Sequence, residues 1–325
     1  MAQKHNLTIQ VLSIIGGALT AIFFLGFLFI SRLIDSEMSC LIIGSILILT
    51  TLTISRLLIR AFLDAMNITL YIAGCSLVSF GMAETAGIHA LFVVLAAISI
   101  LTFVLSKGFI LPFLSVILFN ISLFGEATHF FYSYYPLQIA VVPILAAYLF
   151  INVFEEKLFH LLGEDYLPKY HPFHTALFAS GFVSLGGLSI NHLAYETNGE
   201  LIFCILSVFI WIGLLIMIQR IMQVIKVDKP LNRIGIYILC IIICLPTLFA
   251  PYLSGSLLLI LICFHYGYRV ECTAAVFLFI YAVSKYYYDL NLSLLTKSIT
   301  LFFIGIACIA AWYFFTQKKI RHEKI

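Results

Sequence analysis

Long stretches without a single Asp, Glu, Lys or Arg recur along the whole sequence. An apolar stretch of about 17 or more residues can cross a bilayer as one α-helix. Twelve uncharged stretches can be counted, and the shortest of them need flanking residues to complete a span. They cover residues 8–30, 39–55, 68–83, 88–106, 109–124, 137–154, 175–194, 201–219, 234–250, 252–267, 272–284 and 298–316. The sequence therefore predicts an all-α fold, a polytopic membrane helix bundle with about 12 transmembrane helices.

Composition excludes a water-soluble fold. Hydrophobic residues make up 63% of the chain and charged residues 10%, whereas a soluble domain carries roughly 25% charged residues. A chain of 325 residues cannot hide this much apolar surface from water, so lipid must be its solvent. The net charge of +3 is small and the basic residues gather at segment ends, which argues against a nucleic-acid surface. The expected partner is the lipid bilayer, and no nucleic acid is expected.

The basic residues predict the orientation of the helices. If twelve spans start from a cytoplasmic N-terminus, every Lys and Arg except Arg32, Lys285 and Lys297 falls on the inside. Cytoplasmic loops are enriched in Lys and Arg in this way. We therefore expect a protein of the bacterial inner (plasma) membrane with both termini cytoplasmic. One division stays open, because Pro246 and Pro251 could either kink one helix across 234–267 or separate two helices.

The domain prediction is a single polytopic membrane domain over residues 1–325. Its spans form two six-helix groups, about 8–154 and 175–316, joined by a cytoplasmic loop at 155–174. This loop contains side chains of the metal-binding type, namely Glu156, His160, His171 and His174. Pro168 and Pro172 are predicted to break any helix there, so the spacing does not force the four together. An amphipathic surface helix explains "EEKLFHLLGED" without a ligand, and we expect no metal and no cofactor.

Polar side chains within the predicted spans are few. No span contains a carboxylate, Lys or Arg, which argues against an ion-coupled pump. Asn191 and His192 lie near the outer end of the seventh stretch, and Asn120 lies about one turn from the end of the fifth. These three form a candidate polar pocket. The favoured alternative is that they hydrogen-bond neighbouring helices.

Enzyme signatures are absent from the sequence. There is no Walker loop, GxSxG or HExxH motif, and no paired acidic motif that would hold Mg²⁺. The predicted outside loops are too short to form a catalytic domain. We therefore predict no catalytic residues and a non-enzymatic protein.

The stretch "SKYYYDLNLSLLTKS" (284–298) is the candidate contact site for a partner or a lipid phosphate. It is predicted to join the last two spans on the outer face, with Tyr286, Tyr287 and Tyr288 at the level of the headgroups. Asp289 is placed at a predicted helix start. Lys285 and Lys297 are basic residues on the outside, which a simple turn does not require.

The same C-terminal region resembles a bacterial multi-pass membrane family catalogued as domain of unknown function 4401. The resemblance rests on the tyrosine run, on a "TLLxKS"-like element with Ser293 in place of Thr, and on Gly305 in the last span. The segments "LIIGSILILTTLTISR" and "RAFLDAMNITLYIAGCSLVSFG" are similar in layout. The family has no established activity. The resemblance implies a gene neighbourhood with another multi-pass protein and a small anchored protein, which hints at a membrane complex.

Three functions remain open at this point. The first is the non-enzymatic membrane component of an envelope complex, with other membrane or envelope proteins as partners. The second is a permease for a small neutral or amphipathic solute. The third is a membrane enzyme for lipid-linked substrates, which would have to use the outer tyrosines or a His of the 155–174 loop that lines a cleft with a carboxylate.

Overall fold

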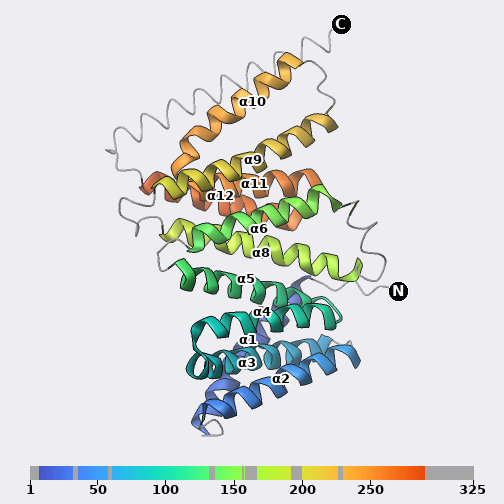
Figure 1. Cartoon of the computed structure of the whole chain (residues 1–325). Helices are drawn as coiled ribbons and strands as arrows, with labels where there is room; N and C mark the ends of the chain where they lie inside the picture. Colours follow the sequence, from blue (N-terminus) through green and yellow to red (C-terminus); the bar gives the residue numbers. More distant parts are fainter. Residues whose placement is uncertain are drawn as a thin grey trace. The chain divides into compact units, whose positions relative to one another are not determined.

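The computed structural model describes residues 7–31, 36–57, 61–131, 136–155, 157, 167–191, 200–225 and 230–289. These residues form eleven α-helices and one 3-10 helix (Figure 1). The helices are α1 (Leu7–Ile30), α2 (Glu37–Leu57), α3 (Ala61–Thr85), α4 (Gly87–Leu105), α5 (Ile110–Phe131), α6 (Pro136–Val153), α8 (Leu167–Asn191), α9 (Glu200–Val224), α10 (Pro230–Cys244), the 3-10 helix η3 (Leu245–Phe249), α11 (Pro251–Tyr266) and α12 (Arg269–Asp289).

The chain divides into two compact units, Met1–Phe279 and Ile280–Ile325. The described part of the second unit is the end of α12.

The predicted all-α class agrees with the structure, and each of the first eleven uncharged stretches lies on a helix. By length and composition, six of the described helices could each cross a membrane: α2, α3, α4, α5, α9 and α12. The twelfth predicted stretch, 298–316, lies outside the described residues. Residues 234–267 form two helices, because α10 ends at Cys244 and α11 begins at Pro251 after the 3-10 turn. Side chains of α9 bind this turn: Ser207 donates to the carbonyl oxygens of Thr247 and Leu248.

The prediction that Pro168 and Pro172 break any helix was wrong. Helix α8 begins at Leu167 and continues through Pro172 to Asn191. The first four N–H groups of a helix have no intrahelical acceptor, so Pro168 removes no bond and Pro172 removes only one. The cost of that one bond is small compared with burying the rest of the helix. As a result, His174 lies within helix α8 and not in a surface loop.

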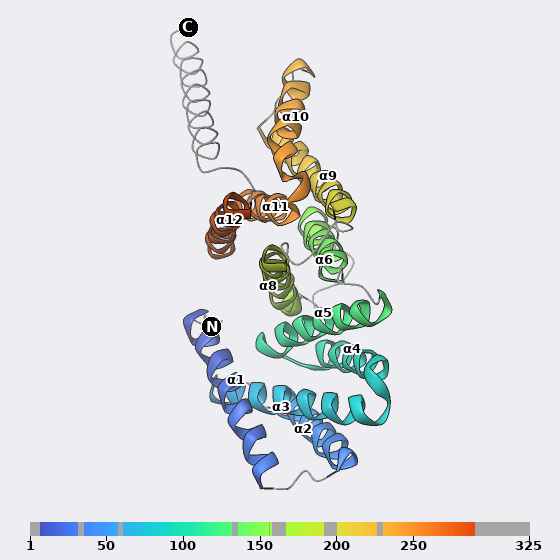
Figure 2. The same ribbon diagram turned by 90° about the vertical axis from the view of Figure 1, so that its left-hand side faces the viewer.

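The helices of the first unit form two neighbouring groups. Helix α3 packs against α1 and α2, and α4 packs against α3 and α5. Helix α5 also contacts α6 and α8, which pack against each other. Helix α11 packs against α9, α8 and α6, so α5 connects the first group to the second (Figures 1 and 2).

The α2–α3 contact is built on glycine. A Cβ atom at Gly44 would lie 2.9 Å from the carbonyl oxygen of Gly74, and one at Gly74 would lie 3.0 Å from that of Gly44. Only glycine permits backbones to approach this closely, and small residues at helix contacts are the usual solution in membranes. Buried Ile48, Leu52 and Val78 fill the space on either side. The result is a dry, close-packed contact.

Two basic side chains close the end of α4. Arg56 Nε donates to the carbonyl oxygen of Leu105 at 3.0 Å, and Lys169 Nζ donates to that of Val104 at 2.6 Å. The last carbonyls of a helix carry partial negative charge, so cations are favourable there. Burial, with Arg56 nearby, lowers the pKa of Lys169. Both residues were predicted for the same side of the membrane, and the fold brings them together.

Candidate functional site

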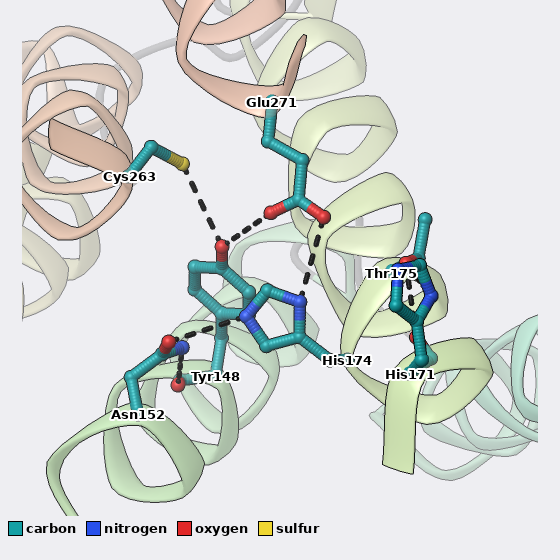
Figure 3. Close-up of polar contacts among 7 residues, drawn as sticks. All are labelled: Tyr148, Asn152, His171, His174, Thr175, Cys263 and Glu271. Carbon is teal, nitrogen blue, oxygen red and sulfur yellow. Dashed lines mark hydrogen bonds and ion pairs between the residues drawn. The ribbon is translucent and has the colours of Figure 1, made fainter. Parts of the chain in front are cut away.

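A buried polar cluster lies where α6, α8, α11 and the start of α12 meet. We call it the His174 cluster, and it consists of Tyr148, Asn152, His174, Cys263 and Glu271 (Figure 3). Tyr148 is fully buried, Asn152 and Cys263 are buried, and His174 is 3% exposed. The Glu271 side chain is 14% exposed. An ionisable pair buried this deeply in a chain this apolar is the feature that most needs a functional explanation.

Local sequence brings these side chains to one place. Tyr148 and Asn152 are four residues apart on α6, so they lie on one face of that helix. Gly267, at φ +78°, ends α11 in the left-handed conformation that glycine tolerates best. The turn it makes starts α12 at Arg269, which places Glu271 in the first turn of α12 beside the end of α11. His174 enters because α8 is helical through Pro172.

The hydrogen bonds determine where the protons of the cluster lie. Asn152 Nδ2 donates to the carbonyl oxygen of Tyr148 at 2.8 Å, which turns Oδ1 of Asn152 toward His174. That oxygen can only accept, so His174 Nε2, 3.2 Å away, carries a hydrogen. The other ring nitrogen, Nδ1, lies 3.4 Å from Glu271 Oε1. Both ring nitrogens therefore face acceptors.

The carboxylate is held from its other side as well. Tyr148 donates its hydroxyl hydrogen to Glu271 Oε2 at 2.8 Å. The Cys263 sulfur lies 3.6 Å from the same hydroxyl. Because the single hydrogen of that hydroxyl is donated to Glu271, the thiol is the donor in this contact. Glu271 is thus stabilised by a phenol and an imidazole, and no described Lys or Arg forms an ion pair with it.

Three tyrosine rings surround His174. The ring centroids of Tyr268 and Tyr148 lie 4.5 and 4.9 Å from that of His174, and Tyr170 lies at 6.0 Å. Burial, together with the charge of Glu155, raises the pKa of Tyr268 to about 12. The Tyr170 hydroxyl has Tyr268 and Glu155 as its polar neighbours. The cluster therefore continues through hydroxyl groups to a second carboxylate.

This arrangement can hold one exchangeable proton. With Nε2–H committed to Asn152, one further proton lies either on Nδ1 of His174 or on Glu271. The pair is electrically neutral in both cases, which is the state a buried site tolerates best. Losing that proton leaves a buried negative charge, and gaining one leaves a positive charge.

A polar recess of about 510 Å³ adjoins the cluster. Asn152 lines it, together with Glu155, Arg220, Gln223, His265 and Tyr266 among others. Asn152 is therefore a hydrogen-bond partner of the buried histidine that also lines an accessible cavity. The recess lies at the ends of α6, α9 and α11, not halfway along them.

The predicted loop residues separate into two kinds. His174 joins the cluster, whereas His171 points away from it (Figure 3). The carbonyl oxygen of His171 accepts a hydrogen bond from the Thr175 hydroxyl one turn along α8. Glu156 and His160 lie outside the described residues. No group of three or more potential metal ligands occurs within the described part of the chain.

The predicted polar pocket is described only in part. Asn120 Nδ2 donates to the Ser180 hydroxyl at 3.0 Å, which links α5 to α8. Asn191 is the last residue of α8, but its side chain and the whole of His192 lie outside the described residues. At Asn120 the structure has the interhelical hydrogen bond that the sequence favoured.

The tyrosine run lies within helix α12, near its last described residue. Helix α12 continues through Tyr286, Tyr287 and Tyr288 to Asp289. The rings of Tyr287 and Tyr288 meet edge to face with centroids 5.6 Å apart, and Tyr288 is 76% exposed. Asp289 is the last described residue of α12. The helix start predicted to follow it, and Lys297, lie outside the described residues.

Sequence reasoning missed Tyr148, Asn152 and Glu271. Spans were identified as runs free of charge, so a carboxylate inside a helix could only be assigned to a loop. Glu271 was placed just outside the span 272–284, whereas α12 begins at Arg269. A usable signal was the Tyr–Asn spacing of four residues in "AAYLFIN", which puts two polar groups on one face of an apolar helix.

Comparison with known proteins leaves the activity open and identifies the family. No curated protein and no solved structure matches the chain. A family model described as domain of unknown function DUF4401 matches residues 6–318, which is nearly the whole chain. The protein therefore belongs to the DUF4401 family, as the C-terminal motif predicted.

Proposed function

We propose that the protein is a non-enzymatic, multi-pass protein of the bacterial inner membrane that acts as a permease for a small neutral or amphipathic solute. The observation that carries the proposal is the buried His174–Glu271 pair beside a polar recess. Ionisable side chains inside membrane helix bundles are costly and mark substrate or proton pathways. The six long apolar helices support the membrane location.

Asn152 is the coupling residue in this proposal. It holds the Nε2–H of His174 and also lines the recess. A solute that hydrogen-bonds the Asn152 amide weakens its bond to His174, which changes how readily the pair releases its proton. In the predicted orientation the recess is a cytoplasmic vestibule, as the helix ends that form it belong to the predicted inner side.

The geometry favours this role over catalysis. A general base must present a free nitrogen to its substrate. Both nitrogens of His174 already face protein groups, and the ring is 3% exposed. His174 therefore does pair with a carboxylate, as an enzyme for lipid-linked substrates would require, but neither of its nitrogens is open to a substrate.

The first test is the stability of the purified protein. Glu271→Gln keeps the shape of the side chain but removes the charge that His174 Nδ1 and the Tyr148 hydroxyl face, so it should lower the free energy of unfolding. Glu84→Gln, at an exposed carboxylate, should not. Equal stability of wild type and Glu271→Gln would contradict an ion pair at this position.

The second test is solute movement. Proteoliposomes that contain a pH-sensitive dye are exposed to a panel of neutral and amphipathic solutes. We expect at least one solute to produce a proton flux, which Glu271→Gln abolishes and Glu84→Gln preserves. Coupling through the cluster would be contradicted by a solute that stabilises the protein but moves without protons in the wild type and in both variants.

A second candidate function is the membrane component of an envelope complex. The observation that favours it is the exposure of Tyr288 at the end of α12, since tyrosine is enriched at protein interfaces. Extraction in a mild detergent should then recover a stoichiometric membrane partner. Tyr288→Ala should lose that partner, whereas Tyr281→Ala, at another exposed tyrosine of α12, should keep it. A clean preparation without partner from native membranes would contradict this function.

A further inference from the structure

A half-open groove runs along α6, α9 and α11. Its volume is about 610 Å³, which falls in the range of roughly 300–1,000 Å³ typical of small-molecule sites. Most of its lining is apolar and includes Leu149, Phe150, Phe209, Ile212, Ile216 and Leu258. The groove is separate from the His174 cluster, whose histidine and carboxylate do not line it.

One end of the groove is polar. Gln219, Arg220 and Gln223 form this end, and Arg220 and Gln223 also line the recess next to it. A second cation lies close by, because Lys157 Nζ is 5.5 Å from the ring centroid of Phe154, which lines the groove. No described carboxylate forms an ion pair with Arg220. The groove therefore has an apolar length and a positively charged end.

The carboxylate nearest to this end is already engaged. Glu155 lines the recess together with Arg220, but it interacts with the hydroxyl of Tyr170 and with Tyr268. Its charge is thus directed toward α8 and the turn before α12. Arg220 and Lys157 remain the charges that a ligand entering the groove would meet.

The length of the groove fits one leaflet of a bilayer. Its lining on α6 extends from Val142 to Val153, and these eleven steps along a helix measure about 16 Å. Half of the hydrocarbon core of a bilayer measures roughly 15 Å. An acyl chain that begins at a headgroup beside Arg220 would therefore be covered along its length.

We propose that this groove binds one acyl chain of an anionic phospholipid, whose phosphate is held by Arg220 and Lys157. The bilayer is the source of this ligand, since the groove is open along its side. Arginine recognises phosphate through two parallel hydrogen bonds, which lysine supports as a point charge. The inference goes beyond the proposed permease, because a bound lipid requires neither transport nor a proton.

The test measures lipid retention by the full-length protein. The protein is reconstituted in nanodiscs of equal parts phosphatidylglycerol and phosphatidylcholine, extracted in detergent, and analysed by native mass spectrometry. We expect one phosphatidylglycerol to be retained in preference to phosphatidylcholine. Arg220→Gln should weaken that preference about fivefold, as expected for one basic residue at an anionic lipid surface. Arg220→Lys should restore most of it.

Matched variants separate the charge from the groove. Lys107→Gln removes one exposed basic residue elsewhere and should leave retention unchanged. Ala146 is exposed and lines the groove, so Ala146→Phe should fill it and reduce retention of both lipids. Ala97→Phe places the same ring on an exposed position of α4 and should have no effect.

Three results would overturn the inference. The first is equal retention of the two lipids by the wild type. The second is a loss for Lys107→Gln as large as that for Arg220→Gln. The third is a release of phosphatidylglycerol by free fatty acid at stoichiometric amounts, which would make a carboxylate amphiphile the ligand.

Discussion

The α2–α3 contact and the His174 cluster join helices by opposite means. At the first, Gly44 and Gly74 bring two backbones together and apolar side chains seal the space. At the second, a histidine, a carboxylate, an amide and a phenol meet in a buried space. Packing contacts have one best geometry, whereas hydrogen-bonded groups can exchange a proton without losing their positions. The first region is held by close packing, and the second by hydrogen bonds between groups that can ionise.

The largest expected effect is the loss of the carboxylate. Glu271→Ala leaves His174 and Tyr148 buried without their partner and should lower the free energy of unfolding by about 3–5 kcal/mol, the usual cost of breaking a buried pair. Unfolding of the purified protein by titration with a denaturing detergent measures it. Glu84→Ala, on an exposed residue of α3, is the control. A loss no greater than that of the control would show that the cluster is not a stabilising contact.

The next effect breaks the glycine contact. Gly74→Leu inserts a side chain against the carbonyl of Gly44 and should cost about 3 kcal/mol, the upper part of the range for overpacking. The same unfolding experiment measures it, and the loss should not vary with pH. Gly16→Leu introduces the same side chain on α1, where nothing lies within 4 Å of the Cβ position. If the two variants were equally stable, the close approach of α2 and α3 would be refuted.

A smaller change removes one donor from the cluster. Tyr148→Phe keeps the ring but deletes the bond to Glu271 Oε2, and should cost about 2 kcal/mol, as for a hydrogen bond to a charged group. Tyr281→Phe, on an exposed residue, serves as the control. A loss no greater than that of the control would mean that the Tyr148 hydroxyl does not stabilise Glu271.

The smallest effect concerns the link between the two helix groups. Ser180→Ala deletes the acceptor of Asn120 between α5 and α8, and should cost about 0.6 kcal/mol, the average for interhelical hydrogen bonds in membranes. Ser76→Ala is matched, because its hydroxyl bonds only to Ile72 of its own helix. A cost above that of Tyr148→Phe would mean that Asn120 belongs to a larger polar network.

The sequence predicted the helices well because apolar length is a local property. Eleven uncharged stretches lie on helices, and the family was recognised from the C-terminal motif. The twelve-span count and the orientation remain predictions. The break at Pro172 was wrong, because a proline near a helix start costs a single bond and not a helix.

The candidate site was much harder to predict. His174 was considered for its chemistry, but its partners lie on three other helices, and their convergence depends on packing that no local pattern records. Glu271 was excluded by the rule that defined the spans. Asn120 was predicted on better grounds, because a lone amide in an apolar helix has few outcomes other than a bond to a neighbouring helix. Lys297 and His192 lie outside the described residues, so both stay predictions.

The position of Glu271 in the chain also affects how the protein is made. The carboxylate that completes the cluster follows His174 by about 100 residues, which takes the ribosome roughly 5–20 s to add. During that interval the imidazole and the Tyr148 phenol are already synthesised but lack their acid. Chains that end before α12 would keep the imidazole and the phenol among their helices without this partner. The cluster is therefore completed only once the start of α12 has been synthesised.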